Sequence, residues 1–573
     1  MTALMQWVFP EGMGEGSLRE RILRSRGLTQ PRDQELFASP LPPLSLLREP
    51  ATLPGADLVA AALDGWMREG LQIAIFGDYD ADGLCAAAIL SRLLRQFGSV
   101  PRVVIPHRVD HGYGLHADSL RQLQAEGVQA VITVDCGIRS FAEAELAAHI
   151  GLRLIVTDHH RVEREADGTI RLPRAEAVAH PHLGGCPFEH ISGSVVAFKV
   201  AKRLIRLRGG ERPPDVLRQW VVNVALPLAA MGLVPDVMPL LDENRVLVAH
   251  AVKLLPTCGL PGIHAMLREA GIDLRSMNAS TISHQIGPRL NALGRLEGAT
   301  DALRLLDTDD QSEARTVAKR LEAVNNERKT LTEELARITQ DRAVKEGFDS
   351  ASRCSIVMAD PQWHPGLLGL AAARLVDRYQ KPVVLFGGES SLLKASGRAP
   401  QGIDLHACLE ECPSLFASFG GHAAAVGGSM TSENVSAFAQ ALEAVVRTRT
   451  DQGMVAARSL PIDASMPIEQ AMACLPEIES LQPFGKDFAA PLIHCGNLVV
   501  RSAATMGRDG AHLKVQVHTK GSQRSTGLLM WRQGNRVGEF RVGRSCEVVG
   551  TPKASSNPRF DSDFEIRDFR LID

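Results

Sequence analysis

The sequence predicts an α/β protein with two α/β domains, a long helix that joins them, and a small C-terminal β-barrel. Three observations lead to this prediction. Short apolar segments alternate with amphipathic ones between residues 57 and 157, no Gly or Pro occurs between Gly298 and Gly347, and five short alternating segments follow Pro491. The first pattern is typical of a parallel, doubly wound sheet. The last is typical of a small barrel of the OB type.

Length and composition exclude several classes of protein. The 573 residues are enough for several domains, and 45% of them are apolar, which is ample for more than one core. Because the net charge is only −3, a site for a polyanion must be a local groove. The ten cysteines include no Cys-x-x-Cys pair, and the closest two, Cys408 and Cys412, have no histidine nearby. Reduced thiols are therefore expected, without a disulfide framework or a structural zinc site.

The sequence indicates a cytoplasmic protein. No basic-then-apolar signal pattern opens the chain. The most apolar long stretch, residues 221–241, contains Asn223, Pro227 and Asp236, which argues against a membrane span.

Changes of pattern divide the chain into five regions. The first is rich in Pro and Arg and is expected to pack as an arm on a neighbouring domain. The regions are the N-terminal arm (1–50), a first α/β domain (51–300), a linking helix (301–346), a second α/β domain (347–455) and a small barrel of a type that often binds single-stranded nucleic acid (456–573). A barrel with a purely structural role is the alternative for the last region.

The linking helix has a single apolar seam and is expected to restart near Asp309. The seam consists of Val317, Leu321, Val324, Leu331, Leu335 and Ile338, at spacings of three, four and seven. A coiled-coil dimer is an alternative, but the run is barely three heptads long. A linker between two domains is the other interpretation.

Three carboxylates mark the turn after the first strand, residues 71–76. Asp78, Asp80 and Asp82 repel one another unless a cation lies between them. Their spacing also matches the start of an EF-hand loop, but Ile89 occupies the twelfth position and a strand precedes the loop. An acidic surface turn is the remaining alternative. We predict a metal site.

Two further apolar strands end in residues of the same chemical type. Residues 131–134 run into Asp135, and residues 154–157 run into Asp158, His159 and His160. Since parallel strands share one carboxyl edge, these side chains are expected to converge with the first turn. Carboxylates with one or two imidazoles suit Mn²⁺ or Mg²⁺.

These motifs resemble those of the DHH phosphoesterase superfamily, and further motifs resemble its RecJ branch. The similarity runs from about residue 50 to the end. The motifs are GDYDADG (77–83), PHR (106–108), GYGL (112–115), TVDCG (133–137), TDHH (157–160), ISGSVVAFK (191–199), VPD (234–236), GPRLN (287–291), GRL (294–296), WHPG (363–366), SGR (396–398) and FGGH (419–422). The resemblance implies that the two α/β domains are a catalytic DHH domain and a substrate-binding DHHA1 domain. It also implies that the long helix links these two domains within a monomer.

The resemblance also implies a two-metal site. Asp135 would bridge the metals, Asp82, His159 and Asp236 would complete one site, and Asp78 and Asp80 would serve the other. Only the resemblance selects Asp236. His160 either protonates the departing 3′ oxygen or contacts Asp135 or Asp158 and orients that side chain without taking part in the reaction. Asp158 is expected to orient the histidines.

The implied substrate contacts lie in both α/β domains. Arg108, Ser396 and Arg398 resemble a pocket for a 5′-phosphate, for which a guanidinium beside a hydroxyl is well suited. The other candidates are Tyr113 for base stacking, Arg289 and Arg295 for backbone phosphates, and Asn291 and His422 by their place in the motifs. The alternative for any single arginine is a surface ion pair.

The resemblance implies a metal-dependent exonuclease that degrades single-stranded DNA from the 5′ end and releases 5′-mononucleotides in DNA repair and recombination. Single-strand-binding protein and a repair helicase are partners that it implies. One alternative is a phosphoesterase acting on short oligonucleotides or a small phosphate ester. The other is a scaffold that binds single strands without cutting them.

Overall fold

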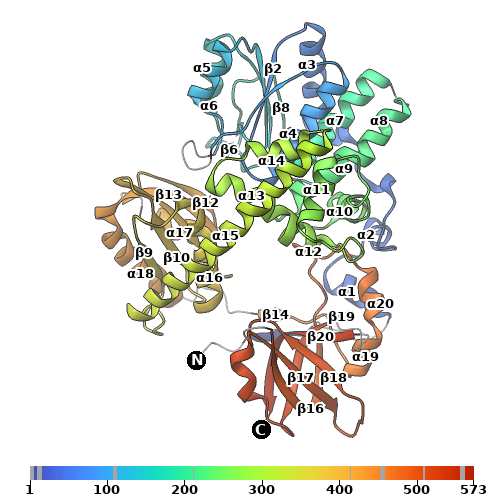
Figure 1. Cartoon of the computed structure of the whole chain (residues 1–573), viewed down its shortest axis with the longest axis vertical. Coiled ribbons are helices and arrows are strands. Elements are labelled where there is room, and N and C mark those ends of the chain that lie inside the picture. The colour runs from blue at the N-terminus through green and yellow to red at the C-terminus, as the bar shows by residue number, and fades with distance from the viewer. Residues whose placement is uncertain are drawn as a thin grey trace. The chain divides into compact units, whose positions relative to one another are not determined.

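The chain forms two compact units in a computed structural model. The structure describes residues 5–9, 16–107, 113–210, 212–412, 415–451, 459–507, 510–554 and 562–572. Unit 1 combines residues 1–47, 239–250 and 458–573, and unit 2 combines residues 48–238 and 251–457. Unit 2 therefore contains both α/β domains, whereas unit 1 contains the barrel and most of the predicted arm (Figure 1).

The first α/β domain is built on a parallel five-stranded sheet of order β3-β2-β4-β5-β8. Its strands are β2 (Ile73–Gly77), β3 (Arg102–Val104), β4 (Ala130–Val134), β5 (Arg153–Thr157) and β8 (Ala177–Ala179), with a small hairpin of β6 (Glu163–Arg164) and β7 (Ile170–Arg171). Every residue of β2 and β4 is buried, because helices cover both faces of the sheet. The predicted doubly wound arrangement is confirmed.

Helices make up the rest of this domain. They are α3 (Ala56–Arg68), α4 (Ala81–Gln96), α5 (Ala117–Ala125), α6 (Phe141–His149), α7 (Gly193–Gly209), α8 (Asp215–Trp220), α9 (Leu226–Leu233), α11 (Pro261–Glu269), α12 (Ala279–Thr281), α13 (Gly287–Leu296) and α14 (Thr300–Asp307). The helix α10 (Asp242–Leu254) begins in unit 1 and ends in unit 2. The helical run Asp215–Leu233 has the length and mean hydropathy (1.4) of a membrane span, but 61% of it is buried inside the domain.

The linking helix α15 spans Gln311–Lys345 and starts at an Asp310 N-cap, which accepts hydrogen bonds from the N–H groups of Ser312 and Glu313. The predicted restart near Asp309 is thus the break between α14 and α15. Figure 1 shows α15 running from α13 and α14 at one end to α16 (Pro365–Tyr379) at the other.

The second α/β domain has a mixed sheet of order β12-β13-β11-β10-β9. Its elements are β9 (Ile356–Ala359), β10 (Val383–Gly387), β11 (Leu392–Arg398), α17 (Leu405–Glu410), β12 (Ser418–His422), β13 (Ala425–Thr431) and α18 (Val435–Asp451), together with α16. Only β9 and β10 pair in parallel.

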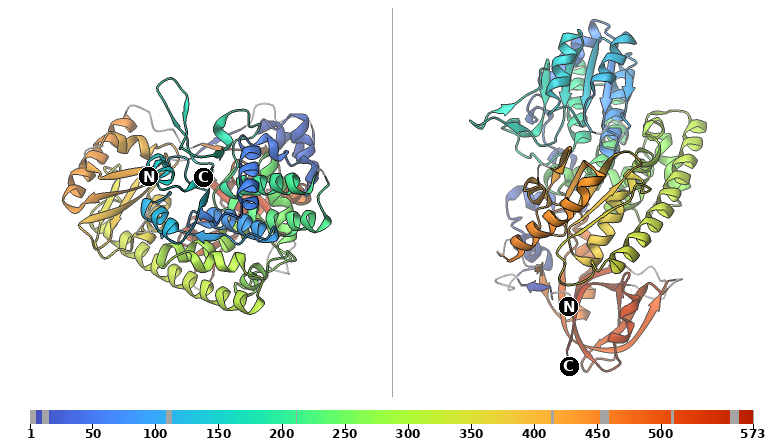
Figure 2. Two further views of the ribbon diagram at one scale, coloured as in Figure 1. Left: turned by 90° about the horizontal axis from the view of Figure 1, so that it is seen from above. Right: turned by 90° about the vertical axis from the view of Figure 1, so that its left-hand side faces the viewer.

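The C-terminal strands close into a barrel, because β16 pairs with both β17 and β19. The strands curl round on themselves in the right-hand view of Figure 2. The elements of this part are β14 (Ser459–Pro461), β15 (Ala464–Ser465), α19 (Ile468–Ala473), α20 (Leu475–Ser480), β16 (Ile493–Met506), β17 (His512–Thr519), β18 (Thr526–Met530), β19 (Ser545–Ala554) and β20 (Ser562–Ile572). The five predicted barrel strands all occur.

The N-terminal arm is part of unit 1. It contributes β1 (Gln6–Val8), α1 (Leu18–Ser25) and α2 (Pro31–Leu36), and β1 pairs in parallel with β14. The indole N–H of Trp7 donates to Asp568 at 2.8 Å, and the Arg570 guanidinium lies 3.9 Å above the Trp7 ring. Residues close to the two ends of the chain thus contact and stabilise each other.

A buried arginine joins the three segments of unit 1. Arg245 of α10 has no exposed surface, and its guanidinium donates to the backbone carbonyls of Leu36, Leu481, Gln482 and Pro483. It also lies 3.9 Å from the ring centroid of Phe37. Burial lowers the pKa of Arg245 to about 9. Its hydrogen bonds replace the water that a buried guanidinium loses.

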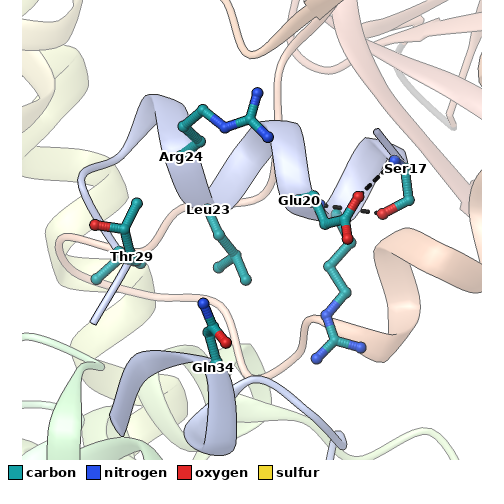
Figure 3. A pocket seen from close by; sticks show the side chains of 8 residues that line it. Ser17, Glu20, Leu23, Arg24, Thr29 and Gln34 are labelled. Carbon is teal, nitrogen blue, oxygen red and sulfur yellow. Dashed lines mark hydrogen bonds between the residues drawn. The ribbon is translucent and has the colours of Figure 1, made fainter. Parts of the chain in front are cut away.

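Unit 1 also contains a pocket of about 440 Å³ beside α1 (Figure 3). Ser17 and Glu20 at its rim form a capping box, drawn as dashed lines, in which each side chain accepts the other residue's N–H. This box occupies the N–H groups of Ser17 and Glu20, and the Arg19 N–H donates to Glu477. None of the candidate metal ligands lines this pocket.

Candidate metal centre

The turn after β2 is shaped by its own carboxylates and a glycine. Asp80 is the N-cap of α4, and its Oδ1 accepts the N–H groups of Asp82 (2.9 Å) and Gly83 (3.2 Å). A Cβ on Gly83 would lie 2.5 Å from the carbonyl oxygen of Asp78, so only glycine fits. This tight turn aims Asp78 and Asp82 at the carboxyl edge of the sheet, where both are buried.

Two ligand positions adjoin strained backbone. Asp135 directly follows β4 with a φ of 61°, and Val237 directly follows Asp236 with a φ of 59°. A β-branched residue in the left-handed region is an outlier. Such strain persists only where the surrounding structure enforces it, and it clusters at functional sites.

The predicted ligands meet around His159. Its Nε2 lies 3.1 Å from Asp135 Oδ1, 3.5 Å from Asp236 Oδ2 and 3.8 Å from Asp82 Oδ2. Three groups have ligand atoms within 4.8 Å of one another: Asp135, His159 and His160; Asp82, His159 and Asp236; and Asp78, Asp80 and Asp135. The structure thus brings together all six residues predicted as ligands, and their coordination of metal stays a prediction.

The cluster fits a divalent cation. Asp135 Oδ1, His159 Nε2 and Asp236 Oδ2 are buried and form no hydrogen bond. Burial and the carboxylates of Asp82 and Asp80 raise the pKa of Asp135 well above its ordinary value. Burial lowers the pKa of His159 to about 4, so its imidazole is neutral and able to bind metal at pH 7. Cations would satisfy these atoms and relieve the repulsion among the acids.

We expect Mn²⁺ to stabilise the protein more at pH 8 than at pH 5. Without metal, Asp135 and Asp236 have raised pKa values, so the stability from their bound protons is present at low pH and is lost as the pH rises through those raised pKa values. Metal binds the deprotonated acids and reverses this loss. The check is the shift in melting temperature on adding Mn²⁺ at each pH. An equal shift at both values would contradict it.

Asp158 organises the two histidines, as the sequence predicts. Its Oδ1 accepts the N–H groups of His159 (2.7 Å) and His160 (3.1 Å) and lies 2.8 Å from His160 Nδ1, while Oδ2 accepts the N–H of Ile138. Although burial lowers the pKa of His160, the charge and hydrogen bond of Asp158 raise it to about 9. His160 is therefore held as an imidazolium with Nε2 directed away from Asp158.

The sequence analysis did not predict two contacts at this site. The N–H groups of Gly193 and Ser194, at the start of α7, donate to the two oxygens of Asp82 at 2.6 and 3.1 Å. The ring Nε2 of His180 lies 2.8 Å from the carbonyl oxygen of His160, while its Nδ1 accepts the N–H of His182. His180 Nε2 is thus the donor and fixes the backbone at His160. The SGS motif offered a signal for the first contact, since small residues at a helix start expose their N–H groups.

The second domain groups three of the predicted substrate residues. Ser396 and Arg398 lie on the same face of β11, with Arg398 Nη1 3.4 Å from Ser396 Oγ. Arg398 and His422 both pair with Ala425 of the intervening strand β13. Helix α16 approaches closely at Gly369, where a Cβ would lie 2.8 Å from both Ser396 Oγ and Arg398 Nη2. The three side chains therefore form one polar group.

The other substrate candidates have varied surroundings. Tyr113 packs 4.8 Å from the His160 ring, and Asn291 accepts the Ala81 N–H at 2.7 Å, which supports the metal turn. Arg295 Nη1 donates to the Gly366 carbonyl, tying α13 to α16. Arg289 forms a two-point ion pair with Glu322 of α15, the alternative considered for a single arginine, although its side chain is buried rather than exposed. Arg108 lies outside the described residues.

Comparison with known proteins identifies the family. Residues 72–226 match the DHH family N-terminal domain, residues 353–448 match the DHHA1 domain, and residues 462–560 match the RecJ OB domain. The single-stranded-DNA-specific exonuclease RecJ of Escherichia coli is 32% identical over 563 residues, covering 93% of this chain and 95% of that protein. This chain belongs to the RecJ family.

Two further RecJ proteins place this chain within the family. The RecJ of Bacillus subtilis is 30% identical over 83% of this chain, which spans only 58% of that longer protein. The crystal structure of Thermus thermophilus RecJ in complex with Mn²⁺ matches with a TM-score of 0.80 and 27% identity, covering all of this chain and 80% of that one. The predicted fold class, with a DHH domain, a DHHA1 domain and an OB barrel, is confirmed.

Proposed function

We propose that this RecJ-family chain is a single-stranded-DNA-specific exonuclease that works from the 5′ end and releases 5′-mononucleotides with two Mn²⁺ or Mg²⁺ ions. The observation that carries the proposal is the pair of groups in unit 2. One is the cluster of five carboxylates around His159, and the other is the Ser396, Arg398 and His422 group. The first suits hydrolysis of a phosphodiester, and the second suits a terminal phosphate.

The chain's own residues set up the hydrolysis. Asp78, Asp80, Asp82, Asp135, His159 and Asp236 would hold the ions, which when bound supply Lewis-acid activation of the phosphate and of the attacking water. Asp82 is held in its orientation because α7 donates two N–H groups to its two oxygens. The strained backbone at Asp135 directs its carboxylate toward His159 and the first turn.

His160 is suited to protonate the departing 3′ oxygen. Asp158 keeps the imidazolium charged and occupies Nδ1, so Nε2 carries the transferable proton. The Tyr113 ring packs against His160 and limits its rotation. The Tyr113 ring is partly exposed, so it can also stack on a base of the substrate.

The proposal includes the cellular setting that family membership supports. The protein would act as a cytoplasmic monomer in DNA repair and recombination, with single-strand-binding protein and a repair helicase as partners. The barrel in unit 1 would also bind the single strand.

End-labelled digestion tests the polarity. A 5′ label on a single strand should appear first as a mononucleotide in the presence of Mn²⁺, and a duplex should resist. Early release of a 3′ label would overturn the polarity. Digestion limited to dinucleotides would instead identify a phosphoesterase for short oligonucleotides.

We expect Arg398→Gln to remove the preference for a 5′-phosphate. Arg398 lies beside Ser396 and offers a guanidinium to the terminal phosphate, so KM for a 5′-phosphorylated strand should rise by about tenfold or more, with a smaller change for a 5′-hydroxyl strand. Arg353→Gln in the same domain, whose guanidinium lies over the Phe348 ring, is a control expected to change neither KM. Equal effects on both substrates would argue against a phosphate pocket.

A further inference from the structure

The apolar face of the linking helix α15 is interrupted near its middle. At one end, Glu313 pairs with Arg304 of α14 and Glu322 pairs with Arg289 of α13. At the other end, Leu335 and Ala343 lie in the core of the second domain with residues of α16. Between them, Asn325, Arg328 and Thr332 recur three and four residues apart on one face of the helix. We call these three residues the polar window.

The polar window contains buried groups without partners. Asn325 has no exposed surface, and its Nδ2 donates no hydrogen bond; Arg328 Nε and Thr332 Oγ1 are likewise buried and unbonded. Arg328 is held in place because its Nη2 donates to Asn325 Oδ1 at 3.0 Å. Leaving a buried polar group unsatisfied is costly, so such a cluster indicates a ligand that completes it.

The surroundings of the polar window are positively charged. Burial lowers the pKa of Arg328, and the nearby charges of Arg289 and Arg374 lower it further. Glu322 neutralises Arg289, but no carboxylate among the described residues pairs with Arg328 or with Arg374 of α16. Two close guanidinium groups without an acid need an anion to offset their repulsion.

The polar window lies at the junction of the helices that carry the proposed catalytic and phosphate-binding groups. On α13, Asn291 holds the Ala81 N–H of the metal turn, and Arg295 donates to Gly366 at the start of α16. On α16, Gly369 contacts Ser396 and Arg398, and Arg374 lies between one and two turns further along. An anion bound at the window would therefore lie at the join between the two α/β domains of unit 2.

We propose that Arg328 and Arg374 bind a backbone phosphate of the single-stranded DNA substrate, with Asn325 orienting Arg328. This inference rests on the proposed function and adds a contact to the internucleotide backbone, distinct from the metal cluster and the terminal-phosphate group. Guanidinium groups from two facing helices can clasp one phosphate from both sides. Neither residue reads a base, so the contact is independent of sequence.

The test measures binding with hydrolysis switched off. In an Asp135→Asn background, fluorescence anisotropy would follow a labelled, 5′-phosphorylated oligo-dT between about 50 and 200 mM salt. Arg328→Gln and Arg374→Gln should each weaken binding about tenfold and lower the slope of log affinity against log salt by roughly 0.7, the value for one lost phosphate contact on a single strand.

Arg337→Gln is the matched control. It removes the same charge from the same helix, but Arg337 is 69% exposed and pairs with Asp341, so its salt slope should equal that of the unsubstituted protein. Arg374→Gln, on a different helix, keeps the test decisive if Arg328→Gln does not fold. Unchanged slopes in folded variants would mean that the window holds only water, and the inference would fall.

The same oligonucleotide separates this inference from the proposed function. If the unsubstituted protein digests it from the 5′ end while the variants bind with the normal salt slope, only the phosphate contact is wrong. If the unsubstituted protein digests no single strand with Mn²⁺, the proposed function fails, whatever the slopes.

Discussion

Asp135→Asn should abolish nuclease activity, with a loss on the order of 10³-fold or more, while leaving the fold intact. Asp135 belongs to two of the three ligand groups and lies 3.1 Å from His159 Nε2. Asn keeps the shape of the side chain and tolerates the left-handed backbone that this position requires, whereas Ala would add backbone strain. The measurement is the rate of mononucleotide release with Mn²⁺.

The same substitution should stabilise the metal-free protein. Because burial and neighbouring acids raise the pKa of Asp135, its ionised form is costly in the metal-free protein, and an asparagine, which does not ionise, avoids that cost. The melting temperature in chelator should therefore rise as activity disappears, which distinguishes lost chemistry from lost folding. Asp118→Asn, at a 96% exposed aspartate of the same domain, is the control and should change neither quantity. Normal digestion by Asp135→Asn would remove the basis of the catalytic assignment.

Arg245→Met should destabilise unit 1 by several kcal/mol, about 3–5 in free energy of unfolding. The side chain fits the same volume, but the carbonyls of Leu36, Leu481, Gln482 and Pro483 lose their donor in a site without exposed surface. Scanning calorimetry should show a transition shifted to lower temperature.

Lys253→Met is the control for this prediction, because Lys253 lies on the same helix and is exposed. It should leave the transition in place. Unit 2 holds all the proposed ligands, so digestion of short oligonucleotides by Arg245→Met should survive at temperatures below the new transition. A melting profile equal to that of the unsubstituted protein would show that the four carbonyls do not depend on Arg245.

The parts of the site that the sequence predicted are those tied to strand ends. Asp82, Asp135 and His159 follow apolar runs that read as parallel strands, and the shared edge of such a sheet forces them together. Asp236 follows the helix α9 instead, in a segment without periodic pattern, so only the family resemblance pointed to it.

The parts that sequence could not predict depend on partners far along the chain. The sequence around Arg289 does not show that it is paired. Its partner, Glu322, lies on a facing helix and is brought opposite it only by the fold. Arg245 gives no local sign of its burial, since its four carbonyl partners come from both the arm and the segment after α20. The support of Asp82 by α7 likewise joins residues 111 positions apart.

Unit 1 is built from three separate segments of the chain, and this affects how it folds during translation. The arm leaves the ribosome before the rest of unit 1. Its strand β1 can pair only after β14 has been made, and Arg245 completes its hydrogen bonds only after the segment that follows α20 has been made. At roughly 5–20 residues per second, that delay lasts tens of seconds. Throughout it, apolar arm residues such as Leu36 and Phe37, buried in the finished protein, remain uncovered on the nascent chain. We therefore expect a chaperone to shield the arm during translation, and a prematurely terminated product to be a ready target for proteolysis.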